Sequence, residues 1–289
     1  MSKANENYTA KLRAKSIVLF IVCILLTLVC LVPIYILIIN STRSHVDIIS
    51  SVSFLPGSQL ARNVNELMTN GLYQFDPFVG FKNSAIIAIC STVLSVFFSA
   101  LTSYGLCVYD FKLRGPAFTF ILAVMMVPMQ VTSVGFLQFM IKLGLSDSFI
   151  PLIIPTIAAP PIVFFMRQYL KSSFPLDIVE AARIDGCGEF RTFLTIAIPM
   201  MKPAIAVQAI FAFIANWNNF YQPSMILVSR KFNQLTMPMM INMLKSNDKI
   251  ADYGVIYAGI ALSIIPVVII YLLLSRFIVE GVALGGVKE

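Results

Sequence analysis

Hydrophobic residues run uninterrupted by charge through six long stretches of the chain, and polar segments separate these stretches. The stretches contain no Asp, Glu, Lys or Arg, and they cover residues 16–42, 83–109, 115–141, 148–166, 203–229 and 253–275. Each is about 19 to 27 residues long, and a helix of about 20 residues crosses a bilayer core about 30 Å thick. None shows the sustained alternation of a barrel strand. The pattern therefore predicts six transmembrane helices in an all-α integral membrane protein.

The same pattern divides the chain into segments inside and outside the membrane. We expect an N-terminal segment over residues 1–15, a first transmembrane helix over 16–42, an outer loop over 43–82, a core with the other five helices over 83–278 and a tail over 279–289. The outer loop contains several Pro and Gly residues and a short amphipathic piece over residues 60–68. The first stretch is longer than the apolar part of a signal peptide, and no small-residue cleavage pattern ends it, so we expect a retained helix.

Composition and charge support this assignment and orient the chain. Hydrophobic residues make up 58% and charged residues 12% of the 289 residues, and the mean hydropathy of +0.85 is too high for a soluble domain. With both termini in the cytoplasm, thirteen of the 21 Lys and Arg residues lie on the cytoplasmic side. The net charge of +7 then arises mostly from segments beside anionic lipid. No basic patch with interleaved aromatic residues indicates a nucleic acid partner.

Side chains that usually carry catalysis are scarce. His45 is the only histidine, and the five cysteines show neither zinc-ligand spacing nor an obvious disulfide partner. No Gly-x-x-x-x-Gly-Lys-Ser/Thr sequence occurs, so the chain does not bind nucleotide in a P-loop. We expect no enzyme activity, no metal site and no cofactor bound by this chain.

The segment between the fourth and fifth expected helices, residues 167–202, is too charged for the bilayer and too long for a simple turn. Good helix formers lead up to Gly186 and Gly188, which permit a sharp stop, and a second helical run ends at Pro199. We therefore expect a short surface helix, a turn and a second helix. The small pair Ala181 and Ala182 would let a partner surface approach closely, although a mere connector along the membrane remains an alternative.

This segment resembles the cytoplasmic loop of permease subunits of binding-protein-dependent ABC importers. Their pattern is Glu-Ala-Ala, three residues, Gly, nine residues, Ile, one residue, Leu-Pro, and the chain matches it at Glu180, Ala181, Ala182, Gly186, Ile196 and Pro199, with Ile198 where Leu is usual. The resemblance implies the type I (MetI-like) permease fold. It also implies that contact with an ATPase is made by Glu180, Ala181, Ala182, Asp185, Gly186 and Pro199.

The resemblance further implies partners and a location. These are a second homologous permease subunit, two ATP-binding subunits that hold ATP and Mg, an extracytoplasmic solute-binding protein and the bacterial cytoplasmic membrane. An ion-coupled secondary transporter is an alternative class, but it would need an ionisable residue at mid-membrane, and the six stretches have none. A structural membrane scaffold is a third class, which would show no energised uptake.

A finer resemblance, to the smaller maltose-permease-like subunits of the carbohydrate-importer branch, covers most of the chain. It rests on Val127-Pro128-Met129-Gln130, residues 144–148, Asn216-Trp217-Asn218-Asn219-Phe220 and the ending Leu284-Gly285-Gly286-Val287-Lys288. It implies a sugar or oligosaccharide as cargo, with a non-sugar solute as the alternative. It also implies that the tail residues Gly285, Gly286, Val287 and Lys288 contact the ATPase. Their glycines predict that residues 282–289 do not continue the sixth helix.

Polar residues in the fifth expected helix indicate where a sugar would pass. If this helix enters the membrane at residue 203, its middle to outer part carries Asn216, Trp217, Asn218, Asn219, Tyr221 and Gln222, and Gln130 adds a polar position in the third helix. Amides offer both donors and acceptors to hydroxyls, and Trp217 and Tyr221, four residues apart on one face, offer flat surfaces to a pyranose. The alternative is that the amides bond to neighbouring helices and the aromatic residues belong to the interfacial belt.

Overall fold

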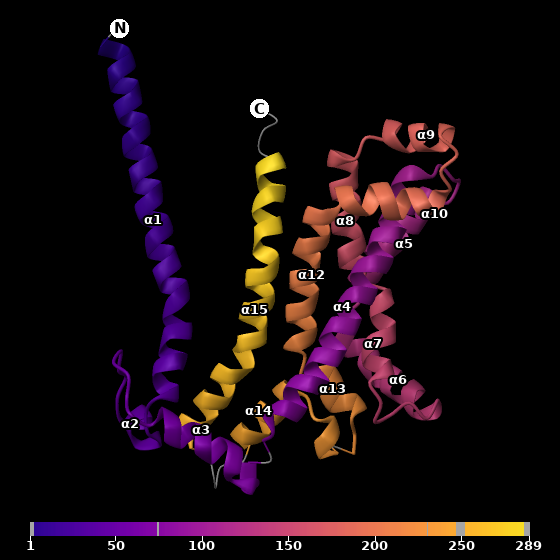
Figure 1. The fold of residues 1–289 in the computed structure, drawn as a ribbon. Coiled ribbons are helices and arrows are strands. Elements are labelled where there is room, and N and C mark those ends of the chain that lie inside the picture. Colours follow the sequence, from indigo (N-terminus) through magenta and orange to yellow (C-terminus); the bar gives the residue numbers. More distant parts are fainter. Residues whose placement is uncertain (1–2, 74, 230, 247–251, 286–289) are drawn as a thin grey trace. The chain divides into compact units, whose positions relative to one another are not determined.

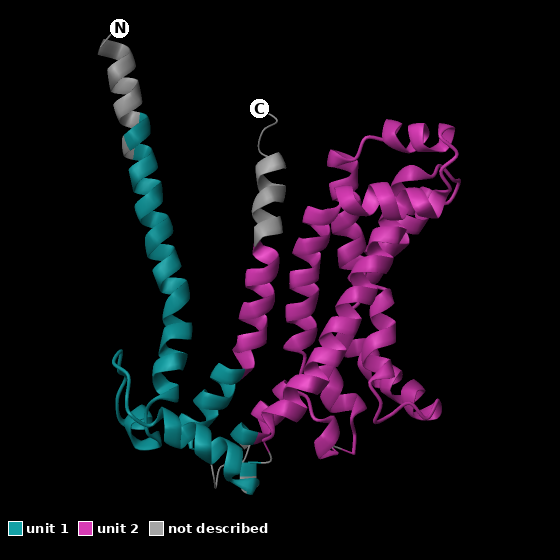
Figure 2. Cartoon of the chain, in the orientation of Figure 1, with its two compact units in different colours: residues 1–73, 244–262 teal, residues 74–243, 263–289 magenta. Residues whose placement is uncertain are grey.

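The computed structural model describes residues 3–73, 75–229, 231–246 and 252–285, and in these ranges the chain is a succession of helices without a strand (Figure 1). The chain forms two compact units (Figure 2). Unit 1 comprises residues 1–73 and 244–262, and unit 2 comprises residues 74–243 and 263–289. Two of the three boundaries fall inside helices, α14 (Met237–Ser246) and α15 (Tyr253–Gly285).

The described part of the chain has four unbroken apolar spans, and up to six if each of two bent helix pairs, residues 114–125 with 129–142 and residues 189–200 with 202–217, is one span. Four helical segments are long and apolar enough to cross a membrane, and they cover residues 15–41, 77–108, 150–173 and 253–275. The third expected helix consists of α5 (Arg114–Met125) and α6 (Met129–Lys142), which meet at 93°. Pro128 explains the break, because it has no amide to donate and forces the preceding Val127 out of helical geometry.

The fifth expected helix is also interrupted. It consists of α12 (Lys202–Trp217) and α13 (Tyr221–Ile226), with Asn218 to Phe220 between them. The Asn219 side chain accepts a hydrogen bond from the Gln222 amide at 3.2 Å, and Pro223 has no amide for the Asn219 carbonyl. The prediction of a continuous helix over residues 203–229 is therefore wrong.

Unit 1 begins with α1 (Lys3–Ser41), followed by α2 (His45–Ser50), α3 (Leu60–Thr69) and the 3₁₀ turn η1 (Gly71–Tyr73). The helix starts at Lys3, but its apolar span covers only residues 15–41, within one residue of the expected 16–42. The expected amphipathic piece over residues 60–68 is confirmed as α3. Over residues 17–34 the side chains of α1 are exposed on all sides and all but Thr27 are apolar, as expected of a helix in lipid.

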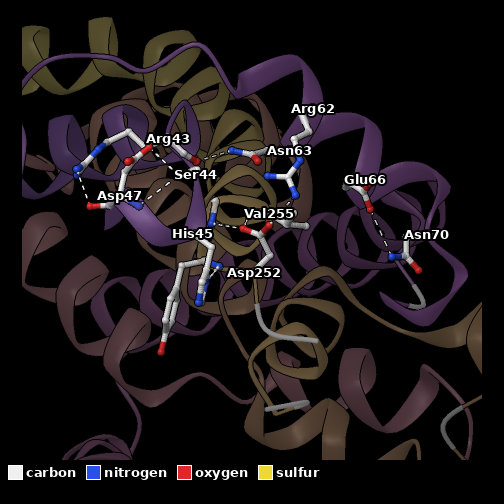
Figure 3. A network of polar contacts seen from close by, with 12 residues as sticks. Arg43, Ser44, His45, Asp47, Arg62, Asn63, Glu66, Asn70, Asp252 and Val255 are labelled. Carbon is white, nitrogen blue, oxygen red and sulfur yellow. Dashed lines mark hydrogen bonds and ion pairs between the residues drawn. The ribbon is translucent and has the colours of Figure 1, made fainter. Parts of the chain in front are cut away.

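A polar junction joins these helices to the start of α15 (Figure 3). The buried Arg43 donates to the Asp47 carbonyl at 2.7 Å, which holds α2 against the end of α1. Asn63 of α3 donates to the carbonyls of Ser41 and Arg43, both at 2.9 Å. The Tyr253 amide donates to His45 Nδ1 at 3.1 Å, and the two rings stack. Side chain to backbone bonds therefore fix four helix ends relative to one another within unit 1.

Unit 2 is built around α4 (Pro77–Val108), whose first turn is capped. Asp76 Oδ1 accepts hydrogen bonds from the amides of Phe78 and Val79, and Pro77 occupies the first helical position. The helix thus begins six residues before the predicted start at residue 83. The remaining elements are α7 (Ile150–Ile153), η2 (Ile154–Ile157), α8 (Pro160–Ser173), α9 (Asp177–Ile184), α10 (Glu189–Thr192), the π-helix η3 (Phe193–Ala197), α11 (Ile198–Met200) and η4 (Phe232–Gln234).

A stripe of small polar residues joins α4 to α8. Ser99, Ser103 and Cys107 of α4 donate to the carbonyls of Ala159, Val163 and Arg167 at 3.5, 2.9 and 3.8 Å. Donors and acceptors both advance by four residues, so the two helices run parallel and in step. Small residues at such a contact let helix backbones approach closely. Because α8 continues to Ser173 with Arg167 buried, the surface segment begins after residue 173 rather than at the predicted residue 167.

The final helix also differs from the prediction. Residues 282–285 are helical, because α15 runs from Tyr253 to Gly285. One glycine costs a helix only about 1 kcal/mol relative to alanine, and a long helix propagates cooperatively through it. The expected tail residues Gly286, Val287 and Lys288 lie outside the described residues.

Candidate functional site

The short helix α9 lies on unit 2 with one face packed and one face open. Val179 is buried in a core cluster with Tyr104 of α4, Phe174 and Phe193. Ala182, one turn further on, is also buried, whereas Glu180, Ala181 and Asp185 are exposed and Ile184 is 87% exposed. The expectation that Ala181 and Ala182 together face a partner is therefore wrong for Ala182. A helix rotates by about 100° per residue, so adjacent residues cannot share one narrow face.

Gly186 terminates α9 in a complete C-cap motif. The Gly186 amide donates to the Arg183 carbonyl at 3.0 Å and the Cys187 amide donates to the Ala182 carbonyl at 2.9 Å. The φ angle of Gly186 is +75°, which side chains with a Cβ rarely adopt. The predicted sharp stop is confirmed, and the positive φ angle explains why glycine is required there.

A three-residue clamp holds the turn closed after α9. Arg183 Nε donates to Glu189 Oε1 at 2.7 Å, and the Tyr109 hydroxyl donates to Glu189 Oε2 at 2.7 Å. The Arg183 guanidinium carbon also lies 5.8 Å from the centre of the Tyr109 ring. Arg183 belongs to α9, Glu189 is the first residue of α10, and Tyr109 directly follows α4. The clamp therefore ties the exposed helix α9 to the end of α4.

The clamp changes the protonation behaviour of its members. Hydrogen bonds from Arg183 and then Tyr109 lower the pKa of Glu189, and the hydrogen bond to Glu189 raises the pKa of Arg183. Burial, followed by the hydrogen bond and charge of Glu189, raises the pKa of Tyr109 to about 12. All three groups therefore keep the protonation states that the clamp needs across the neutral range.

Pro199 lies apart from the other predicted coupling residues. It is exposed in α11, next to the point where the segment Glu189–Met200 turns by 80° into α12. Since Pro199 cannot donate to the Thr195 carbonyl, the chain adopts the π-helix η3 just before it, in which the Ile198 amide bonds to the Phe193 carbonyl. Pro199 therefore shapes the connection between α9 and α12.

Some of the residues expected to contact cargo are packed against other side chains, whereas others are exposed. Trp217 is 2% exposed, its ring stacks on Phe213 and Phe81, and its Nε1 donates to the Ser263 carbonyl at 3.1 Å. Asn216 donates to the Ala212 carbonyl of its own helix at 2.8 Å. Because α12 ends at Trp217, the expected helical face shared by Trp217 and Tyr221 does not form. The indole is buried and stacks on two protein rings, so Trp217 is a packing residue.

Tyr221 connects α13, which follows the break after α12, to α6, which follows the break after α5. Its hydroxyl lies 2.8 Å from the Oγ atom of Ser133. Ser133 is one helical turn after Gln130 in α6, so α13 lies against α6 close to Gln130. Gln130 and Asn218 are exposed, and Asn219 donates to Gln222 Oε1 at 2.7 Å. The structure therefore brings Gln130, Asn218, Asn219, Tyr221 and Gln222 to the two helix breaks.

Sequence reasoning missed one connection on the opposite side of unit 2 from α9. Asp147, with a φ angle of 59°, accepts hydrogen bonds from the amide and the hydroxyl of Ser229, and its own carbonyl accepts from Gln234 Nε2 at 2.8 Å. The bonds from Ser229 lower the pKa of Asp147. Residues 144–148 entered the sequence analysis only through the family resemblance, and no local pattern there indicates a partner more than 80 residues away. The four-residue spacing of Ser91, Ser95, Ser99 and Ser103 was, in contrast, a readable signal for the α4–α8 contact.

Several apolar spans, two helix breaks that lie beside exposed amides and a clamped surface helix are together typical of a multi-span membrane transport protein. The family model for binding-protein-dependent transport system inner membrane components matches residues 92–283, and the chain belongs to this family.

Two relatives are similar along nearly their whole length. The arabinooligosaccharides transport system permease protein AraQ of Bacillus subtilis (strain 168) is 34% identical over 267 residues, which cover 91% of this chain and 92% of that protein. The lactose transport system permease protein LacG of Rhizobium radiobacter is 30% identical over 281 residues, with 97% and 99% covered.

A solved structure shows the same fold. It is described as a bacterial ABC transporter involved in the import of the acidic polysaccharide alginate, and one of its chains matches with a TM-score of 0.73 and 22% identity, covering 96% of this chain and 98% of that one. The expected type I permease fold is thereby confirmed. The family is a transporter family, so the chain is a permease component, and its apolar spans make it a multi-pass membrane protein.

Proposed function

We propose that this chain is one of two permease subunits of an ATP-driven importer for a sugar or oligosaccharide in the bacterial cytoplasmic membrane. The observation that carries the proposal is similarity over more than nine tenths of the chain to permeases named for arabinooligosaccharide and lactose transport. The second permease would be a homologue, and an extracytoplasmic binding protein would deliver the solute.

The open face of α9 supports docking on an ATP-binding subunit. Glu180, Ala181, Asp185 and Gly186 are exposed there beside Ile184, an apolar side chain with little cover in the chain itself. A small helix presenting an apolar residue and flanking charges fits a groove of a partner protein. ATP and Mg would bind on two such partner subunits, since this chain has no phosphate-binding loop of its own.

The clamp supports the transmission of movement from the docked α9 helix to the membrane-spanning helices. Val179 and Ala182 pack into the core of unit 2, and Glu189 joins Arg183 to Tyr109 at the end of α4. Packed cores move as rigid bodies rather than deforming continuously. A displacement of α9 by the ATP-binding subunits would thus move α4 and α8 together and expose the pathway alternately to either side.

The helix breaks support a pathway lined by Gln130, Asn218, Asn219, Tyr221 and Gln222. Irregular backbone is tolerated at membrane depth where it lines a cavity or is buried in protein, and amides there match sugar hydroxyls. Trp217 and Asn216 would support this wall from behind. For the tail, we propose that Gly285, Gly286, Val287 and Lys288 contact the ATP-binding subunits, as in the importers that the chain resembles.

The test is uptake by the reconstituted importer in proteoliposomes loaded with ATP. Labelled arabinotriose and lactose would be compared with a labelled amino acid and with inorganic phosphate. ATP-dependent uptake of a sugar is the expected result. Uptake of only a non-sugar solute would contradict the cargo, and uptake driven by an ion gradient without ATP would contradict the transporter class.

Pathway variants sharpen that test. Gln130→Ala and Tyr221→Ala are expected to raise the sugar concentration needed for half-maximal uptake several-fold, because each removes hydrogen-bonding groups worth about 1 kcal/mol. Cys90→Ala, an exposed position on α4, is the control and should leave uptake unchanged. Equal uptake by all three variants would place the cargo elsewhere.

A further inference from the structure

A hairpin in unit 1, residues 51–57, folds back along α1. At its base the Gly57 amide donates to Thr42 Oγ1 at 2.8 Å, and at its tip the Tyr35 hydroxyl donates to the Phe54 carbonyl at 2.5 Å. In Figure 1 the chain after α2 turns back beside the end of α1. A Cβ on Gly57 would lie 2.5 Å from the Thr42 carbonyl oxygen, so glycine permits this close return.

The two anchors determine how far the hairpin reaches along the membrane span. Thr42 and Tyr35 are seven residues apart, about 10 Å along a helix axis. The apolar span of α1 covers residues 15–41, about 40 Å of helix, which exceeds a hydrocarbon core of about 30 Å by about 5 Å at each end. Tyr35 lies about 9 Å from Ser41, and therefore about 4 Å inside the hydrocarbon boundary. The tip that it holds lies at the same depth.

The chemistry of the hairpin suits that depth. Residues 48–61 contain no charged residue and no histidine. Three apolar side chains at the tip are exposed, Val52 at 80%, Phe54 at 58% and Leu55 at 76%, and the hydroxyl of Ser53 between them is bonded within the hairpin. Val46 and Ile49, three residues apart on α2, extend the exposed apolar surface. Such a surface is costly in water but not against lipid.

Three backbone polar groups at the tip, the carbonyls of Phe54 and Leu55 and the amide of Leu55, are paired within the chain. Tyr35 bonds to the Phe54 carbonyl, and Ser53 Oγ bonds to both the amide of Leu55 at 3.0 Å and its carbonyl at 3.3 Å. Pro56 has no amide to satisfy. Each of these hydrogen bonds lowers the cost of placing irregular backbone next to lipid, because an unpaired backbone group there costs several kcal/mol.

We propose that the 51–57 hairpin inserts its apolar tip into the bilayer leaflet at the C-terminal end of α1, with Tyr35 setting its depth. The occupant is lipid rather than protein, because the exposed tip lies beside the surface of α1, whose side chains are exposed on all sides over residues 17–35 and are apolar there except Thr27 and the hydroxyl of Tyr35. The hairpin then anchors the polar junction of unit 1 at the membrane surface. Nothing in this proposal depends on the cargo.

Collision measurements on a nitroxide label test the proposal in the full-length chain. The five cysteines are replaced with serine, and Leu55→Cys is labelled in lipid nanodiscs, both with the chain alone and in the assembled importer. Asn65→Cys on α3, exposed in the same unit, is the matched control. We expect the ratio of oxygen to nickel-chelate collisions to be several-fold larger at position 55 than at position 65 in both preparations.

Two results would overturn the insertion of the tip. Nickel access at position 55 equal to that at position 65 would show that the tip faces water. Protection from both reagents that appears only on assembly would show that a protein partner covers it. Tyr35→Phe, which removes the hydroxyl, should lower the ratio at position 55 toward the control, and an unchanged ratio would refute Tyr35 as the residue that sets the depth.

Discussion

At the scale of single residues, Gly186 is the position where backbone conformation decides function. Gly186→Val places a β-branched residue at a φ angle of +75° and should cost about 1 to 2 kcal/mol locally, opening the turn after α9 and abolishing ATP-coupled uptake. Gly186→Asn is the matched control, since asparagine tolerates positive φ angles and the space around the Cβ is empty. Uptake and solute-stimulated ATP hydrolysis are the measurements. Normal rates in the valine variant would show that the turn does not couple the two.

The clamp residues give a second prediction, on pH. The pKa of Glu189 is lower in the fold than its ordinary value of 4.5, so its stabilisation is present above that pH and is lost as pH falls through the folded pKa. The pKa of Tyr109 is raised from 10.0 to about 12, so its stabilisation is present below pH 10 and is lost as pH rises between these values.

Melting temperatures of the native chain and of Glu189→Gln, in detergent, measure this dependence. The melting temperature of the native chain should exceed that of the variant by a constant amount through the neutral range. This excess should shrink below pH 4.5 and again between pH 10 and about 12. A difference that stays the same at every pH would mean that the clamp does not contribute to stability.

At the scale of elements, the parallel contact of α4 with α8 holds unit 2 together. Ser103→Leu would force a larger side chain into a fully buried position beside the Val163 carbonyl and should destabilise the fold by about 1 to 3 kcal/mol. Val93→Leu enlarges a 61% exposed side chain of the same helix and is expected to be neutral. Denaturant unfolding in mixed micelles compares the two variants, and equal midpoints would contradict the role of the stripe.

At the scale of the whole molecule, the tail tests assembly with the ATPase. Deleting residues 285–289 should weaken the coupling of ATP hydrolysis to uptake while leaving insertion of the spans unchanged, because the deletion starts at the last residue of α15 and beyond the apolar span. The number of ATP molecules hydrolysed per solute imported is the measurement. An unchanged ratio and rate in the truncated importer would show that the tail is dispensable.

The sequence by itself determined the all-α membrane-spanning class, the short helix before Gly186 and the family. Each of these depends on local properties: the free energy of moving a window of residues into lipid, the need for glycine at a positive φ angle, and a motif of fixed spacing. None of them requires knowledge of which residues meet in space.

Only the tertiary structure decided which predicted residues work together. Hydropathy averages over a window, so it could not show the 93° bend after α5 or the end of α12 at Trp217. Nor could it show that Phe81 of α4 stacks on Trp217, because such a contact depends on a residue from another part of the chain. Glu189 bonds to Tyr109 across 80 residues, and such long-range pairing is set by how helices pack rather than by any local pattern.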